Sequence, residues 1–354
     1  MTRGGAARRL AAAAAYGGGG LSVLGGSVWG LLVAEAQLAR RAIGNADHDR
    51  VLDPSGWYGH GRPGPALRIA LLGDSSAAGY GVESVEETPG AILASGVAEV
   101  ADRRVRLTAV AKVGAQSKDL QEQLDRILPD RPHVAVVFIG ANDVTHSVPV
   151  RTSVRLLGEA IRRMREADVE VVIATCPDLG TIEPLAPPLK QIARAWSRRL
   201  AAAQARTTVE CGGRSVALAS ILTSEFARLS ELLFGPDRFH PSAVGYHRMA
   251  SAVLPTVLAA LDLAPAEDQA PELARGEALL PLDIAASEAA RHPGASVEPV
   301  AEEESAAAGL RGRFVLLRRR RRRPDAEVES PQESEESSVP AEEHADSSPA
   351  AQLP

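Results

Sequence analysis

The stretch VAVVFIGAND, residues 134–143, decides the fold. Its first six residues are all apolar, which is typical of a central strand that is covered on both faces. Its last four are small or polar, and polar loops at the carboxyl ends of parallel strands are where such sheets carry chemistry. Residues 134–139 are therefore predicted to form a buried strand that leads into a functional loop.

Short β-rich runs alternate with longer helical patterns on both sides of this strand. The expected strands are Arg68–Leu72, Val105–Ala111, Val134–Ile139, Val169–Thr175 and Ser215–Ala219. The expected helices are Pro89–Asp102, Ser117–Ile127, Ser153–Ala167, Leu189–Ala205 and Ala243–Leu261. This alternation predicts an α/β domain in which a parallel sheet of about five strands lies between helices.

Composition divides the 354 residues into four parts. Residues 1–45 are a Gly-, Ala- and Arg-rich segment, 46–65 a linker, 66–262 the α/β domain, and 263–354 a low-complexity tail rich in Pro, Ala, Glu and Ser. The tail is expected to be disordered because it has few bulky apolar residues. Within it, FVLL at 314–317 precedes six arginines, and this run could contact anionic lipid or remain a solvated charge block.

The N-terminal segment has no charged residue from Leu10 to Ala34, and arginines flank this stretch on both sides. Such a stretch is long enough to cross a bilayer as a helix. It predicts a membrane anchor or an exported protein, with the α/β domain outside the cytoplasm. A cleaved signal peptide and a cytoplasmic Gly/Ala-rich leader are the alternatives.

The loops after the predicted strands carry residues suited to acyl transfer, which needs a nucleophile, a base and a group that orients the base. Ser75 follows the first strand in the run GDSS, and Asp237 and His240 share a late loop, DRFHP. Gly114 and Asn142 lie in the two loops between, where backbone and amide N–H groups could stabilise a developing oxyanion. Each motif alone is more typical of a turn or a helix cap, and it is their order, after different strands, that indicates chemistry.

The runs Gly73-Asp74-Ser75, Gly114, GAND at 140–143 and DRFH at 237–240 resemble the four sequence blocks of the SGNH (GDSL-like) hydrolase superfamily. Ser76 stands where the family name has Leu. The resemblance implies a flavodoxin-like three-layer α/β/α fold and esterase or lipase activity without a metal. It also implies that Ser75, Asp237 and His240 form the catalytic triad, and that Ser75, Gly114 and Asn142 form the oxyanion hole.

The expected function is hydrolysis of a carboxylic ester of a lipid, an acetylated glycan or a small molecule. Acyl transfer at the same site and a catalytically inactive ligand-binding module remain alternatives. No cofactor, metal or nucleic-acid partner is expected, because the sequence has no phosphate loop or metal-ligand spacing, and a net charge of −6 indicates no partner. Cys176 and Cys211 are interpreted as buried residues, and a disulfide between them is left open.

Overall fold

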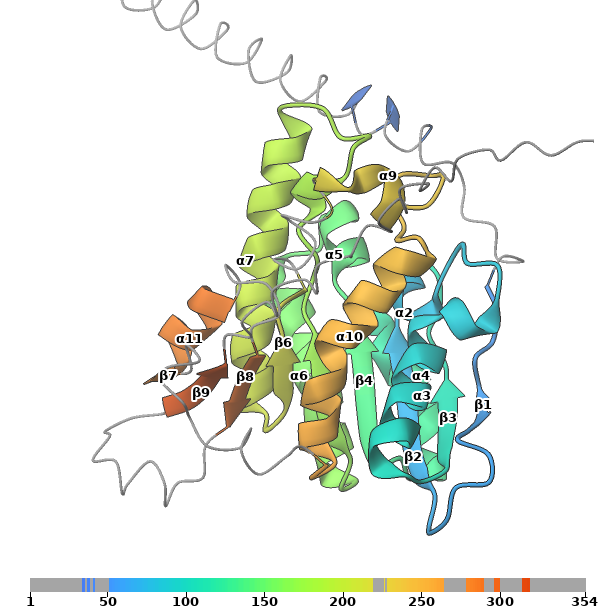
Figure 1. The fold of residues 1–354 in the computed structure, drawn as a ribbon. Coiled ribbons are helices and arrows are strands. Elements are labelled where there is room, and N and C mark those ends of the chain that lie inside the picture. The colour runs from blue at the N-terminus through green and yellow to red at the C-terminus, as the bar shows by residue number, and fades with distance from the viewer. Residues whose placement is uncertain are drawn as a thin grey trace, which may run out of the picture. The chain divides into compact units, whose positions relative to one another are not determined.

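The computed structural model describes residues 51–218, 226, 228–263, 278–289, 296–299 and 314–318, and residues 34, 35, 37, 38 and 41. Five parallel strands form the centre of its sheet (Figure 1): β2 (Leu67–Gly73), β3 (Val105–Ala109), β4 (Val134–Phe138), β5 (Glu170–Ala174) and β6 (Arg214–Val216). Their order is β3-β2-β4-β5-β6. Counted along the chain this is 2-1-3-4-5, the flavodoxin-like order. The predicted fold class is confirmed.

Helices cover both faces of this sheet (Figure 1). The elements are α3 (Pro89–Ala101), α4 (Leu120–Ile127), α6 (Val150–Glu166), α7 (Leu189–Glu210) and α10 (Ala243–Ala260). Alternate residues of β4 enter different cores: Val136 packs with residues of α3 and α10, and Val137 with residues of α4 and α6. This two-sided burial explains why residues 134–139 are apolar throughout. The five expected helices all form, although α7 continues to Glu210 and α6 begins at Val150.

Shorter elements connect these helices and strands. They are α2 (Ser75–Ala78), η2 (Val85–Glu87), η3 (Ser117–Asp119), η4 (Leu128–Asp130), α5 (Ala141–Thr145), η5 (Leu179–Thr181) and α9 (Ser230–Leu233). Three of them, α2, α5 and η5, follow the carboxyl ends of β2, β4 and β5. They therefore lie at the edge of the sheet where the sequence predicts the site.

Elements also form outside the expected domain limits. The segment expected to be a linker contains β1 (Gly56–Tyr58), which pairs antiparallel with β3. The expected disordered tail contains β7 (Ala278–Pro281), α11 (Leu282–Ala289), β8 (Ser296–Pro299) and β9 (Phe314–Arg318), and β8 pairs with β6. These strands are three to five residues long. Such short runs are stabilised by pairing with a neighbouring strand and leave little periodicity in the sequence.

Three further expectations concern the uncharged N-terminal stretch, the arginine run and the two cysteines. The predicted span, residues 10–34, lies outside the described residues except for its last one. Among the helices that are described, none is long and apolar enough to cross a bilayer. Residues 319–323 of the arginine run also lie outside the described part. Cys176 is buried and Cys211 is partly buried, and both are free thiols in this structure.

The carboxyl ends of the central strands are held by two buried glutamines. The side chain of Gln123 accepts a hydrogen bond from the N–H of Gly73 at 2.8 Å and donates one to its carbonyl at 2.9 Å. Gln204 accepts from the N–H of Cys176 at 2.7 Å and donates to the carbonyl of Ile139 at 3.0 Å. Strand ends cannot complete a ladder, so these amides satisfy backbone groups that burial would otherwise leave unpaired.

Gly73 is the tightest point of this edge. Its φ is +132°, and a Cβ there would lie 1.9 Å from the carbonyl oxygen of Phe138. We expect Gly73→Ala to cost at least about 4 kcal/mol, since it combines left-handed backbone strain with a backbone clash. Chemical unfolding followed by circular dichroism measures this loss.

Gly81→Ala is the matched control, because Gly81 also has a positive φ, +91°, but a Cβ there would meet no atom within 4 Å. That variant should lose only about 1 kcal/mol, from strain alone. Equal losses in the two variants would contradict the role assigned to the Gly73 contact.

Candidate active site

Ser75 is presented by the turn from β2 into α2. Asp74 caps this short helix by accepting the N–H of Ser76 at 2.9 Å, and Ser75 is its first residue. A first helical residue has no carbonyl four positions earlier in its helix, so the N–H of Ser75 is not used by the helix. The hydroxyl and the N–H of Ser75 therefore both lie at the open edge of the sheet.

Ser75, His240 and Asp237 form a continuous chain of hydrogen bonds. The Nε2 atom of His240 lies 3.0 Å from the Oγ of Ser75, and its Nδ1 lies 2.6 Å from Oδ2 of Asp237. A carboxylate only accepts hydrogen bonds, so Nδ1 carries the proton and Nε2 accepts from the serine hydroxyl. The structure thus brings together the three side chains that the sequence predicted to form the triad.

The ring of His240 is held by contacts on both sides as well as by Asp237. The ring centroid of Tyr80 lies 4.4 Å from that of His240, and Phe239 packs edge-on against it at 4.7 Å. The second oxygen of Asp237 accepts the backbone N–H groups of Phe239 and His240, at 3.0 and 2.9 Å. Asp237 therefore folds its own loop and orients the imidazole at the same time.

Burial tends to raise the pKa of Asp237. The hydrogen bond and electrostatic attraction of the His240 ring, and the two loop N–H groups, lower this pKa by more than burial raises it. The net effect lowers the pKa below its usual value of 3.8. Asp237 is therefore a carboxylate at any pH near neutrality, as the proton on Nδ1 requires.

The predicted oxyanion-hole residues come from three loops. Asn142 lines the same pocket as Ser75 and His240, and its side-chain amide donates to the carbonyl of Ala115 at 3.1 Å. Gly114 precedes that residue, has φ +82° and is exposed, but it is not among the residues that line the pocket. The structure thus places Asn142 in the same pocket as the nucleophile, whereas Gly114 lies outside the pocket lining, in the loop that Asn142 holds.

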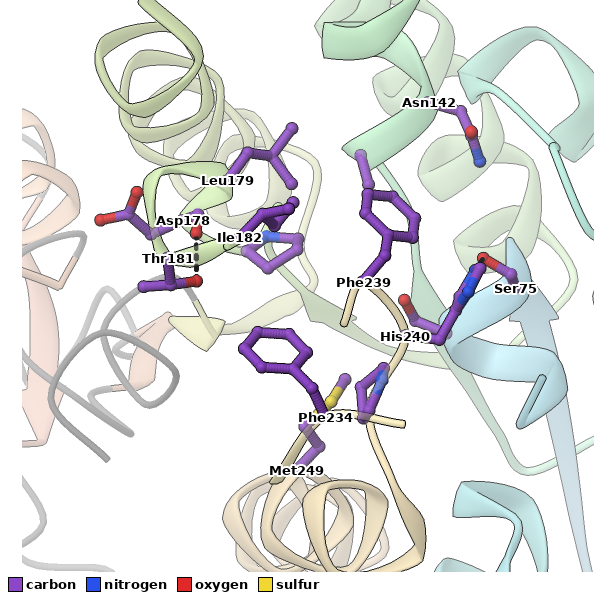
Figure 2. A pocket seen from close by; sticks show the side chains of 14 residues that line it. Ser75, Asn142, Asp178, Leu179, Thr181, Ile182, Phe234, Phe239, His240 and Met249 are labelled. Carbon is purple, nitrogen blue, oxygen red and sulfur yellow. Dashed lines mark hydrogen bonds between the residues drawn. The ribbon is translucent and has the colours of Figure 1, made fainter. Parts of the chain in front are cut away.

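A pocket with largely apolar walls opens beside Ser75 (Figure 2). It is a narrow pocket that is open at its mouth, with a cavity volume of about 40 Å³. Its apolar lining residues are Pro177, Leu179, Ile182, Phe234, Phe239 and Met249. A nucleophile at the end of such a pocket can reach the carbonyl of a ligand whose apolar part fills the rest.

Comparison with known proteins agrees with this geometry. Residues 71–248 match the family model described as the GDSL-like Lipase/Acylhydrolase family. The GDSL-like esterase Rv1075c of Mycobacterium tuberculosis (strain ATCC 25618 / H37Rv) is 39% identical over 228 residues, which cover 61% of this chain and 72% of that protein. The chain belongs to the GDSL-like lipase/acylhydrolase family. It is therefore an ester hydrolase of the SGNH type.

Solved structures of similar fold include TesA, with a TM-score of 0.45 and 17% identity over 55% of this chain and 99% of that one. Axe2, an acetylxylan esterase from Geobacillus stearothermophilus, has a TM-score of 0.41 and 16% identity over 56% of this chain and 97% of its own.

Several residues that shape this GDSL-type site escaped the sequence analysis. Tyr246, which is fully buried on α10, donates its hydroxyl to the carbonyl of Tyr80 at 3.0 Å and so supports the ring beside His240. Asp143 accepts the hydroxyl of Ser117 at 2.6 Å, which ties α5 to the segment after β3. Tyr80 follows the GDS motif by only five residues, but Tyr246 and Ser117 had no motif that could have identified them.

Asp74, the acid of the GDS motif, is 2% exposed. Burial raises its pKa from 3.8 to about 7; the hydrogen bonds from Ser76 lower it, and the nearby charge of Asp143 raises it. In the folded enzyme Asp74 therefore binds a proton that the unfolded chain releases near its usual pKa. This proton stabilises the fold fully below that usual pKa, and the contribution is lost as the pH rises through about 7.

Asp74→Asn should remove this pH dependence and keep the helix cap, because asparagine caps as well as aspartate. Between pH 5 and pH 8 we expect the wild type to lose about 2 kcal/mol more unfolding free energy than the variant. Urea unfolding at both pH values measures the difference. An identical pH dependence in the two proteins would show that Asp74 titrates normally.

Proposed function

We propose that this hydrolase cleaves carboxylic esters through an acyl-enzyme on Ser75. The observation that carries the proposal is the hydrogen-bond chain from Ser75 through His240 to Asp237, with the serine at the end of an apolar pocket. A serine hydroxyl is a weak nucleophile until a base takes its proton, and a base works best when a third group fixes its tautomer. Ser75 is suited to be the nucleophile, His240 the base, and Asp237 the group that fixes the tautomer of the base.

In the first half of the reaction, the Oγ of Ser75 attacks the ester carbonyl while Nε2 of His240 takes the hydroxyl proton. The carbonyl oxygen becomes an oxyanion, and the N–H of Ser75 and the amide of Asn142 donate to it. The N–H of Gly114, in the loop that Asn142 holds, is the third proposed donor. Collapse of this intermediate breaks the ester C–O bond. His240 gives its proton to the departing alcohol, and the acyl group stays on Ser75.

In the second half, water replaces the alcohol. Nε2 of His240 takes a proton from the water, whose oxygen attacks the acyl carbon, and the same donors bind the new oxyanion. The C–O bond to Ser75 then breaks, His240 returns the proton to Oγ, and the carboxylic acid leaves. Asp237, ionised throughout, stabilises the imidazolium in both halves.

The pocket walls favour an uncharged acyl group. The pocket has apolar surface from Leu179, Ile182, Phe234 and Phe239. Each methylene group of an acyl chain that is buried there stabilises the complex by about 0.8 kcal/mol. We propose esters of lipids, acetylated glycans or small molecules as the substrate class, with the acyl part in this pocket.

Ser75→Ala should lower kcat on short p-nitrophenyl esters by at least about 10⁴-fold, because the nucleophile is lost while the fold is kept. Labelling by a fluorophosphonate probe should vanish with it. His240→Ala should cause a comparable loss. Steady-state kinetics and gel-based labelling of purified protein measure both effects.

His247→Ala is the matched histidine control, since His247 lies on α10, is exposed and is not among the pocket-lining residues. Its kinetics should stay within about twofold of the wild type. A Ser75→Ala protein that keeps full turnover would refute the assigned nucleophile. Formation of an ester product with an added alcohol, at the expense of the acid, would indicate acyl transfer instead.

We also propose that residues 1–45 anchor the enzyme to a membrane or export it, with the hydrolase domain outside the cytoplasm. The support is the uncharged stretch of residues 10–34 with arginines on both sides. Glu35, the next residue, accepts the N–H of Leu189, the first residue of α7, at 3.0 Å.

Full-length enzyme should sediment with membranes and resist extraction by carbonate, whereas protein that begins at residue 46 should be soluble and keep its esterase activity. Fractionation followed by activity-based labelling of Ser75 measures both. Full-length enzyme in the soluble cytoplasmic fraction would contradict this placement.

A further inference from the structure

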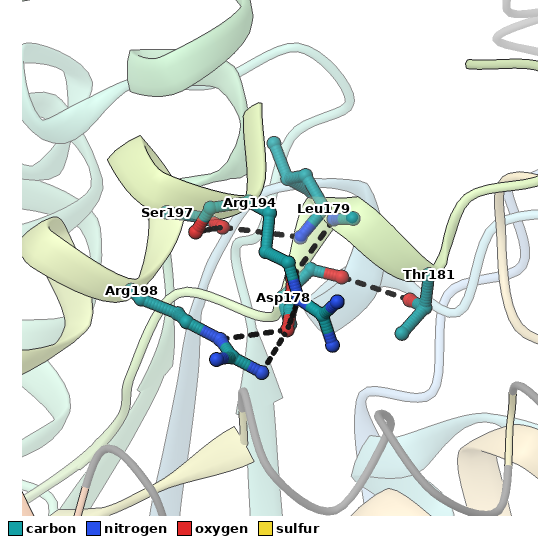
Figure 3. Close-up of polar contacts among 7 residues, drawn as sticks. Asp178, Leu179, Thr181, Arg194, Ser197 and Arg198 are labelled. Atoms are coloured by element: carbon teal, nitrogen blue, oxygen red, sulfur yellow. Dashed lines mark hydrogen bonds and ion pairs between the residues drawn. The ribbon is translucent and has the colours of Figure 1, made fainter. Parts of the chain in front are cut away.

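Asp178 is a fully buried aspartate among the residues that line the pocket. Figure 3 shows its polar contacts. It caps η5, in the loop that follows β5. Its Oδ2 lies 3.3 Å from Nε of Arg194 and 2.9 Å from Nε of Arg198, and both arginines project from α7. A buried carboxylate is costly unless it is paired, and the guanidinium groups of Arg194 and Arg198 provide that pairing here.

The same carboxylate also holds the loop backbone. Its other oxygen, Oδ1, accepts the N–H of Gly180 at 2.9 Å, and its main-chain carbonyl accepts the hydroxyl of Thr181 at 2.8 Å. The N–H of Leu179 donates to the hydroxyl of Ser197, on α7, at 3.2 Å. One side chain thus joins the arginines of α7 to the backbone of the η5 turn.

Gly180 shows how closely loop and helix approach. A Cβ at this residue would lie 2.6 Å from the Cβ of Arg194 and 2.9 Å from Oδ1 of Asp178. The stem of Arg194 therefore passes directly over the turn that Asp178 folds. We call Asp178, Arg194 and Arg198 the clasp.

The clasp lies behind one wall of the pocket. Leu179 and Ile182 line the pocket and face Phe239 across it (Figure 2). They share an apolar cluster with Ala141 and Phe239, which neighbour Asn142 and His240 in the chain. A shift of the η5 turn would change the length and width of the apolar space without moving Ser75 itself.

We infer that the clasp sets the length of the acyl chain that the enzyme accepts. Asp178, Arg194 and Arg198 are positioning residues that keep Leu179 and Ile182 at a fixed distance from the nucleophile. An acyl chain that reaches this wall is rejected, because packed side chains yield little to added methylenes. The inference rests on the proposed function, since it concerns the acyl group that Ser75 receives.

The test compares kcat/KM for p-nitrophenyl acetate, butyrate, hexanoate and octanoate. Arg194→Ala/Arg198→Ala should raise the octanoate-to-acetate ratio about tenfold, the size of discrimination that a hydrophobic pocket gives. Acetate turnover and the rate of fluorophosphonate labelling of Ser75 should stay within about twofold, because the two replaced arginines are not among the residues that line the pocket. Arg194→Lys/Arg198→Lys, which keeps both charges, should restore most of the original ratio.

Gly180→Ala reaches the same wall from the loop side and keeps every charge, so it tests the inference even if the double variant fails to fold. It should change the ratio by more than about twofold, because the added Cβ displaces the turn from Arg194 on α7. Arg155→Ala is the control, because it removes an exposed arginine paired with Glu159 on α6, and it should leave the profile unchanged.

A ratio that stays within about twofold in Gly180→Ala and in every folded clasp variant would overturn the inference, and so would an equal loss on all four esters. Failure of the proposed function is distinguishable. In that case Ser75→Ala and the wild type would have the same kcat/KM on every ester, whatever the acyl-chain length.

Discussion

The approach of Gly73 to the backbone of Phe138 is the constraint on which the site depends. β2 and β4 are neighbours in the sheet, and the N–H of Asp74 donates to the Phe138 carbonyl at 3.0 Å, where a side chain on Gly73 would collide. Beyond this point the two chains diverge, because β2 leads towards α3 on one face and β4 towards α6 on the other. The crevice that opens there is the switch point of a flavodoxin-like sheet, and it holds Ser75 and Asn142.

The catalytic hydrogen bonds divide into a local and a long-range part. Asp237 and His240 are three residues apart, and the turn that Asp237 folds makes their contact almost independent of the rest of the chain. Ser75 lies 165 residues from His240, so their contact depends on how α10 packs against the sheet. The buried Tyr246 on α10 joins the two parts, since its hydroxyl reaches the backbone of Tyr80, whose ring contacts His240.

The sequence predicted the sheet and the order of its loops because both follow from local patterns. Continuous apolar strands have a strong signal, and motifs at strand ends must meet at one edge of a parallel sheet. Gln123, Gln204 and Asp178 could not be predicted, since a polar residue in a helix or loop is ordinarily exposed and only tertiary contacts bury these three. The short strands β1, β7, β8 and β9 could not be predicted either, because they form by pairing with neighbouring strands and have little periodicity of their own.

Three aspartates near the nucleophile differ in their burial and in the groups that pair with them. Asp237 has the imidazole and two backbone N–H groups, and its pKa is lowered; Asp74 is buried, and its pKa rises to about 7. Asp178 is fully buried and has two guanidinium groups. Below neutral pH Asp74 is therefore largely protonated, whereas Asp237 is the carboxylate that His240 requires. An oxyanion forming at Ser75 is therefore not opposed by a full negative charge on Asp74, its neighbour in the chain, and this favours acyl transfer.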